Sequence, residues 1–254
     1  MPELGLNIDH VATLREARYR GWKAGLPPEP SVLEAARVAE QAGVAAITVH
    51  LREDRRHIQD ADVKKLSRDV LIPLNLEMAA TPAMTRHAIR IKPEEICLVP
   101  ENREEVTTEG GLDVAGDVKR LKLVVRKLHI AKIEVSAFID AELAQVDAAH
   151  RIGAQTVELH TGAYANTTAR GARRKEIARH ARAAVHAHEM GMRVNAGHGL
   201  HYNNVREFIE DVPHLHTLNI GHSIISRALF IGLDQAVREM LELIGSHASG
   251  PNTD

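Results

Sequence analysis

The chain has 254 residues, of which 44% are apolar, and a formal charge of −2 without any dense basic stretch. This composition argues against a disordered chain and against a nucleic-acid partner. A single cysteine, Cys97, excludes an intramolecular disulfide framework and a cysteine-rich zinc site. No apolar run reaches about 18 residues and the first residues lack a signal-peptide pattern, so we expect a cytoplasmic protein without a membrane span.

Short β-type runs alternate with helical patterns along the chain. Ser31 and Glu34 form a capping-box pattern that opens a predicted helix, and this helix should end near Gly43. The predicted strands lie near 4–9, 45–50, 72–77, 95–100, 133–139, 155–160, 192–196 and 216–221. Eight strand–helix units in this length predict an α/β fold, a parallel (β/α)8 TIM barrel, as a single domain over 1–245. The polar tail over 246–254 is expected to be disordered.

A spacing of seven residues between a glycine and a histidine occurs three times. The pairs are Gly43 and His50, Gly153 and His160, and Gly191 and His198. Each glycine stands where a helix should end in a left-handed cap, and each histidine stands where the next strand should end. The repeat therefore indicates that one geometry, from the end of a helix through the next strand to the end of that strand, occurs three times.

The predicted strands are less apolar than buried parallel strands should be. In five of them polar and apolar residues alternate, so the polar set should face the barrel interior. This set comprises Asn7, Asp9, Thr48, His50, Asn75, Glu77, Glu158, His160, Asn195 and Asn219. An unpaired buried polar group costs about 1–3 kcal/mol, so these groups must bond one another, water or a ligand. At the carboxyl ends of the strands, where barrel active sites form, histidines provide groups that titrate near neutrality.

Several loops after the strands have the composition of anion sites. Gly197-His198-Gly199 and Gly221-His222-Ser223 follow the seventh and eighth strands, where barrels often bind phosphate; a plain turn is the alternative. The arginine-rich stretch 48–57 is either an anion site or a solvated loop. The loop 106–111 carries two glycines and two threonines, and is either a closing lid or an ordinary loop.

At these motifs the sequence resembles the pyridoxine 5'-phosphate synthase family over about residues 4–243. The shared motifs are N-I-D-H-V-A-T-L-R, T-V-H-L-R-E-D-R-R-H-I, N-L-E-M, L-V-P-E, V-T-T-E-G-G-L-D-V, H-T-G-x-Y-A, V-N-A-G-H-G-L and L-N-I-G-H. One departure is the stretch 19–28, which looks longer than the family's usual first loop.

The resemblance implies a reaction without cofactor or metal. Two small phosphorylated substrates, 3-amino-2-oxopropyl phosphate and 1-deoxy-D-xylulose 5-phosphate, would condense to pyridoxine 5'-phosphate, phosphate and water. His50 and Glu77 would accept protons and His198 would donate one. The residues expected to hold the amino ketone phosphate are Asn7, Arg18, Gly199, Gly221 and His222. Those expected to hold the sugar phosphate are Asp9, His10, Arg52, His57 and Thr107. The family also forms a homo-octamer.

Two other functions remain open on the residues alone. A metal-dependent barrel hydrolase or aldolase would use His50, Glu77 and His198 as metal ligands, and their spacing does not separate this from proton transfer. A non-catalytic phosphosugar-binding barrel would keep the anion sites without needing His50 and Glu77.

Overall fold

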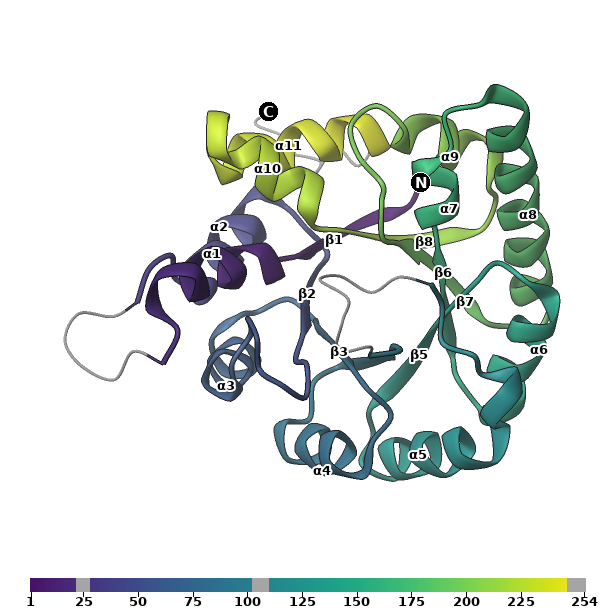
Figure 1. The fold of residues 1–254 in the computed structure, drawn as a ribbon, viewed down its shortest axis with the longest axis horizontal. Coiled ribbons are helices and arrows are strands. Elements are labelled where there is room, and N and C mark those ends of the chain that lie inside the picture. The colour runs from purple at the N-terminus through teal and green to yellow at the C-terminus, as the bar shows by residue number, and fades with distance from the viewer. Residues whose placement is uncertain (22–27, 102–109, 246–254) are drawn as a thin grey trace, which may run out of the picture.

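The computed structural model describes residues 1–21, 28–101 and 110–245 (Figure 1). Thr107, most of the loop 106–111, most of the long stretch 19–28 and the tail 246–254 lie outside the described residues.

Eight parallel strands close into a barrel in the order of the sequence. They are β1 (Glu3–Asn7), β2 (Ala46–His50), β3 (Leu74–Met78), β4 (Glu95–Leu98), β5 (Glu134–Ile139), β6 (Thr156–His160), β7 (Arg193–Gly197) and β8 (Leu215–Ile220). β1 pairs with β8 as well as with β2, which leaves no sheet edge. The predicted TIM barrel is confirmed, and every predicted strand begins and ends within two residues of the observed one.

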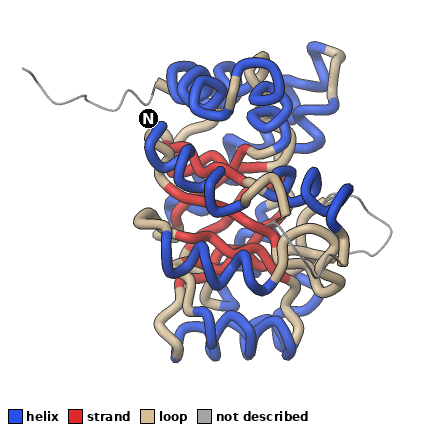
Figure 2. Tube along the Cα trace, turned by 90° about the vertical axis from the view of Figure 1, so that its left-hand side faces the viewer, coloured by secondary structure: helices blue, strands red, loops and turns tan. Residues whose placement is uncertain are grey.

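Helices surround the barrel, and Figure 2 shows the strands as an inner layer between them. They are α1 (Asp9–Tyr19), α2 (Val32–Ala42), α3 (Asp60–Asp69), α4 (Pro82–Ile91), the 3-10 helix η1 (Ala115–Asp117), α5 (Val118–Ile130), α6 (Leu143–Ile152), α7 (Gly162–Asn166), α8 (Arg170–Glu189), α9 (Val205–Asp211), α10 (His222–Ile231) and α11 (Leu233–Ile244). Apolar strand residues such as Leu6, Ile47 and Leu159 are fully buried. In the described part of the chain, no helix has the length and apolar character needed to cross a bilayer.

The predicted helix ends are confirmed. Ser31 caps α2 by accepting a hydrogen bond from the Glu34 N–H, and Gly43 after this helix has φ +104°. Gly153 and Gly191 also adopt left-handed backbone, with φ of +91° and +76°. The histidines seven residues later end β2 and β6 or directly follow β7. The repeat therefore corresponds to one recurring connection from helix to strand.

The barrel interior is polar, as the alternation predicts. Asn75 donates to Thr48 (3.4 Å), the Thr48 hydroxyl donates to Asn219 (3.2 Å), and Asn219 donates to Glu158 (2.6 Å). All four side chains are at most 5% exposed. Buried polar groups thus bond one another across the barrel, while Asn75 Oδ1 and Glu158 Oε1 have no hydrogen-bond partner among the described residues.

The first strand ends earlier than its pattern suggests. Asn7 is the last residue of β1, and Asp9 is the first residue of α1 rather than a strand residue. An acidic side chain is favoured in the first turn of a helix because the helix dipole is positive there. Asp9 consequently reaches the site from a helix N-terminus.

Candidate active site

A cavity of about 780 Å³ opens at the carboxyl ends of the strands. Eleven of the thirteen predicted site residues line it, namely Asn7, Asp9, His10, His50, Arg52, His57, Glu77, His198, Gly199, Gly221 and His222. Of the other two, Thr107 lies outside the described residues and Arg18 does not line the cavity. Arg18 is exposed in the last turn of α1, with its guanidinium 5.9 Å from the centre of the Tyr19 ring.

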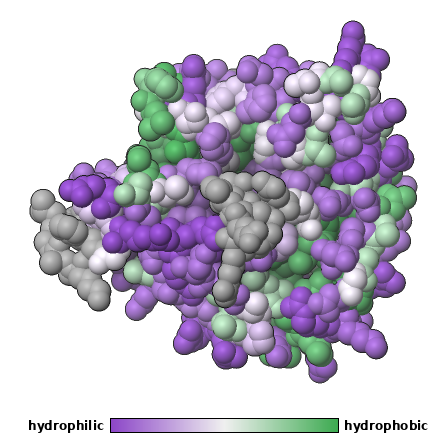
Figure 3. Space-filling view, viewed as in Figure 1, coloured by the Kyte–Doolittle hydropathy of each residue, from purple (hydrophilic) through white to green (hydrophobic). Residues whose placement is uncertain are grey.

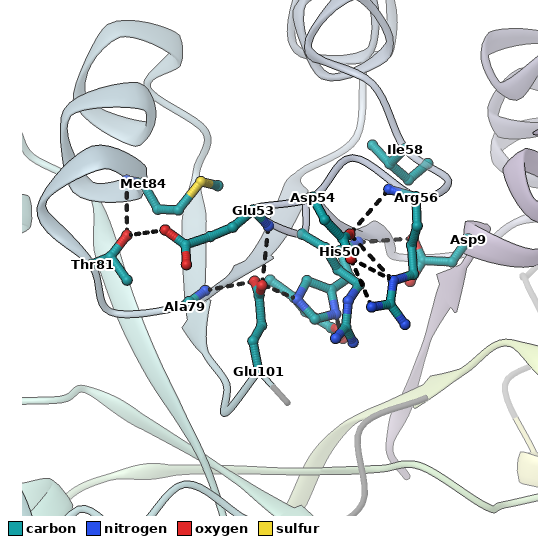
Figure 4. Close-up of polar contacts among 12 residues, drawn as sticks. Asp9, His50, Glu53, Asp54, Arg56, Ile58, Ala79, Thr81, Met84 and Glu101 are labelled. Carbon is teal, nitrogen blue, oxygen red and sulfur yellow. Dashed lines mark hydrogen bonds and ion pairs between the residues drawn. The ribbon is translucent and has the colours of Figure 1, made fainter. Parts of the chain in front are cut away.

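His50 lies among three carboxyl groups, two of which, those of Asp9 and Glu101, are labelled in Figure 4. Its backbone N–H donates to Asp9 Oδ1 at 2.8 Å, which ties the end of β2 to the start of α1. Its ring nitrogen Nε2 is 3.1 Å from Glu101 Oε1, and Nδ1 is 3.8 Å from Glu77 Oε2. The ring is therefore fixed between Glu101 on one side and Glu77 on the other.

Glu77 is the most deeply buried acid of this group, at 2% exposure. Burial raises its pKa to about 7, although the imidazoles of His198 and His50 act in the opposite direction. A carboxyl group with a pKa near the working pH can both accept and return a proton. The predicted proton acceptors His50 and Glu77 are thus neighbours.

His198 faces the fully buried Glu158, with Nδ1 3.7 Å from Glu158 Oε1. Burial lowers the pKa of His198, but the carboxyl groups of Glu158 and Glu77 raise it by more, so the net pKa lies above its ordinary value. Its backbone has φ +66°, a conformation that costs a non-glycine residue about 1–3 kcal/mol. The buried Thr161 holds this turn, because its hydroxyl lies 2.9 Å from the Gly197 carbonyl and 2.8 Å from that of His198. His198 is well placed to carry a proton for donation.

The two glycine motifs adjoin the cavity where the chain approaches itself closely. Gly199 has φ +109°, and a Cβ there would lie 2.7 Å from the Ala165 Cβ. A Cβ on Gly221 would lie 2.9 Å from the Asn7 carbonyl oxygen. The helix after the eighth strand is α10, which begins at His222. The Ile224 N–H donates to the Gly221 carbonyl, so the N–H groups that this helix leaves without intrahelical acceptors are those before Ile224, the usual arrangement for binding phosphate.

Two further histidines contribute neutral donors. Burial lowers the pKa of His10 and of His57. His57 Nδ1 accepts the Ile58 N–H at 2.8 Å, which leaves the proton of the neutral ring on Nε2. His10 meets His222 edge to face, with ring centres 5.0 Å apart. Both residues can therefore bind an anion without adding charge.

Three residues of the site have no role in the sequence analysis. The sequence pattern places Glu158 only among the alternating interior residues, and Glu101 is only the last residue of the motif L-V-P-E. Asp140 is not singled out, and it lies 3.1 Å from Nδ1 of His160, which also lines the cavity. The signal available was position, since Glu101 and Asp140 closely follow β4 and β5.

The metal-ligand set suggested by the sequence is not the one that the barrel assembles. Among the described residues, the group able to share an ion is Asp9, His50 and Glu77, whose ligand atoms lie within 4.8 Å of one another. His198 is not part of this group.

The fold and the site together indicate the class of protein. A barrel with acid–base groups at its carboxyl face and adjoining glycine turns is typical of (β/α)8-barrel enzymes that act on anionic substrates. The family model described as "Pyridoxal phosphate biosynthesis protein PdxJ" matches residues 4–246, and the chain belongs to this family.

Named relatives agree with this assignment. Pyridoxine 5'-phosphate synthase of Akkermansia muciniphila is 53% identical over 241 residues, covering 95% of this chain and 98% of the relative. The enzyme of the same name from Opitutus terrae is 55% identical over 240 residues, covering 93% and 96%. Among solved structures, KGPDC from Streptococcus mutans has a TM-score of 0.65 at 12% identity, covering 96% of this chain and 98% of its own. This structural likeness supports the fold alone.

Proposed function

We propose that this chain is a pyridoxine 5'-phosphate synthase that condenses 3-amino-2-oxopropyl phosphate with 1-deoxy-D-xylulose 5-phosphate. The products are pyridoxine 5'-phosphate, phosphate and water. Membership of the PdxJ family supports the reaction. The observation that carries the proposal is the convergence of His50, Glu77 and His198 on one cavity, where the pKa of Glu77 and the pKa of His198 are both raised, as such chemistry needs.

Ring closure requires repeated proton transfers, and each predicted group has a distinct part. Glu77, whose pKa burial raises to about 7, accepts protons together with the adjacent His50. His198, whose pKa burial lowers but the carboxyl groups of Glu158 and Glu77 raise by more, donates to a leaving oxygen. General acid–base groups of this kind contribute about 10²–10⁴-fold each. Holding two substrates together in one cavity adds up to about 7–11 kcal/mol.

Two regions of the cavity suit the two anionic substrates. Gly199, Gly221 and His222, with Asn7 beside them, would hold the amino ketone phosphate through backbone N–H groups and the start of α10. Asp9, His10, Arg52 and His57 would hold the sugar phosphate near His50. Arg18 and Thr107 are retained as binding residues on the family resemblance alone.

The deciding experiment incubates the purified protein with both substrates and identifies the product by mass spectrometry. Formation of pyridoxine 5'-phosphate with release of one phosphate supports the proposal. Activity abolished by chelation, with stoichiometric metal in the protein, would favour the metal-dependent alternative at Asp9, His50 and Glu77. Tight substrate binding without turnover would favour a non-catalytic phosphosugar-binding barrel.

We further propose that the chain works as a cytoplasmic homo-oligomer, an octamer by family resemblance. An apolar patch supports self-association: Leu229 and Phe230 of α10 are 69% and 84% exposed. The patch lies over the end of α10, at the upper left of Figure 3.

A further inference from the structure

Glu101 lies outside the set of residues to which the proposed reaction assigns a role, yet it contacts the ring of His50 directly. Figure 4 shows its carboxyl group between three nitrogen atoms, two from the end of β2 and the residues just after it and one from the segment after β3. Oε1 is 3.1 Å from His50 Nε2 and 3.2 Å from the backbone nitrogen of Ala79, and Oε2 is 3.0 Å from the backbone nitrogen of Glu53. The end of β2, the segment after β3 and the segment after β4 meet at this one side chain.

The three contacts determine which ring nitrogen of His50 carries the proton. The Ala79 and Glu53 nitrogens are backbone donors, and they favour an ionised acceptor. Burial raises the pKa of Glu101, but hydrogen bonds from His50 and from the Glu53 N–H lower it by more, so the net pKa lies below its ordinary value. An ionised carboxylate only accepts hydrogen bonds, so the proton between Glu101 and His50 belongs to His50 Nε2.

The opposite nitrogen of the ring is therefore the basic one. In a neutral imidazole one nitrogen carries the hydrogen and the other carries the lone pair. Nδ1 faces Glu77 at 3.8 Å, which is beyond hydrogen-bond distance, and the ring lines the cavity. Among the described residues no donor bonds Nδ1, which can therefore take a proton on the side where Glu77 exchanges one.

We infer that Glu101 is the positioning residue of His50: it accepts the Nε2–H and thereby directs the Nδ1 lone pair toward Glu77 and the cavity. A carboxylate that fixes the tautomer of a catalytic imidazole is a general device of acid–base sites. The effect of Glu101 on turnover rests on the proposed function, whereas its effect on the tautomer of His50 is independent of that function.

The test compares Glu101→Ala and Glu101→Gln with the parent protein, using ¹⁵N-labelled histidine and NMR to assign the His50 tautomer. In the parent, neutral His50 should be the Nε2–H form. In Glu101→Ala the carboxyl group left facing the ring is Glu77, so the proton should move largely to Nδ1. Glutamine offers one acceptor atom where the carboxylate offers two, and its amide group then faces a donor, so Glu101→Gln should give a mixture of tautomers.

Kinetics with both substrates form the second measurement. Both variants should lower kcat about 10- to 100-fold, a usual cost of losing an orienting partner, and change either KM by less than about threefold. Glu101→Asp should recover part of kcat. Glu53→Gln is the matched control, since its side chain accepts from the Thr81 hydroxyl at 2.8 Å in the same network and this variant should stay within about twofold of the parent rate.

Three outcomes decide the matter. An Nε2–H tautomer that persists in Glu101→Ala, confirmed as folded by its thermal melt, overturns the inference. A kcat within about twofold of the parent in both variants also overturns it. A parent protein that makes no pyridoxine 5'-phosphate, but shows the Glu101-dependent tautomer, removes the proposed function and leaves the positioning role intact.

Discussion

At the scale of single residues, Glu77 combines deep burial with two imidazole neighbours, and its pKa of about 7 suits the role of proton acceptor that we propose for it. An amide keeps the shape of this side chain but cannot exchange a proton. Glu77→Gln should therefore lower kcat about 100-fold or more. Its Kd for 1-deoxy-D-xylulose 5-phosphate, measured by titration calorimetry, should change by less than about threefold. Turnover near the parent rate would remove Glu77 from the mechanism.

Glu158 adjoins His198, the proton donor that we propose. It lies 3.7 Å from His198 and helps to raise the pKa of that histidine. Glu158→Gln should lower the pKa of His198, so the donor loses its proton at lower pH than in the parent. The alkaline limb of the kcat–pH profile should then move to lower pH, and the NMR titration of His198 should move with it. An unchanged limb together with a shifted titration would show that His198 is not the donor.

At the scale of elements, local sequence patterns predict where strands and helices begin and end within one strand–helix unit. Alternation of polar and apolar residues locates the strands, and Gly43 locates a helix end, because both signals depend on neighbouring residues. The end of β1 is mispredicted, since the alternation continues to Asp9 while that residue already begins α1. The contact of Glu101 with His50 spans 51 residues and depends on how neighbouring strands are placed, which no local pattern encodes.

The connection from β6 to α7 supports the strained turn after β7. Thr161 is fully buried, and its hydroxyl lies within hydrogen-bond distance of the carbonyls of Gly197 and His198. Thr161→Val keeps the shape but removes this donor, which should cost about 1–3 kcal/mol and loosen His198. We expect a lower melting temperature and a reduced kcat. Thr167→Val is the control at the other end of α7, because among the described residues the Thr167 hydroxyl bonds only the nearby Ala163 carbonyl. Equal losses in both variants would contradict a specific support of His198.

At the scale of the whole molecule, the apolar end of α10 tests the proposed self-association. Phe230→Asp places a charge in an exposed apolar patch that a partner copy would bury. Analytical ultracentrifugation should then report a smaller assembly than for the parent. Leu71→Asp is the control, because Leu71 is 92% exposed and lies far from α10 in the sequence. An unchanged assembly in the Phe230 variant would exclude this patch as an interface.

The polar interior extends to the end of the barrel opposite the active site. Glu95, the first residue of β4, is paired in register with Asn75 of β3 and Glu134 of β5. Burial raises its pKa to about 7, although Arg193 acts in the opposite direction. One oxygen of its carboxyl group has no hydrogen-bond partner among the described residues. The fold thus favours the protonated form of Glu95, and ionising this group works against folding.

This raised pKa makes stability depend on pH in a defined direction. The unfolded chain ionises Glu95 near its ordinary pKa of 4.5, whereas the folded chain keeps the proton up to about pH 7. The contribution of Glu95 is therefore fully present below the lower value and is lost as pH rises through the higher one. Glu95→Gln keeps a neutral group of the same shape, so it should remove this loss. Its free energy of unfolding relative to the parent should grow by about 2 kcal/mol from about pH 5 to about pH 8 in urea titrations. Glu189→Gln, at an exposed position of α8, is the control, and its free energy of unfolding should match that of the parent at every pH. A Glu95→Gln variant that also matches the parent at every pH would contradict a buried, protonated carboxyl group at Glu95.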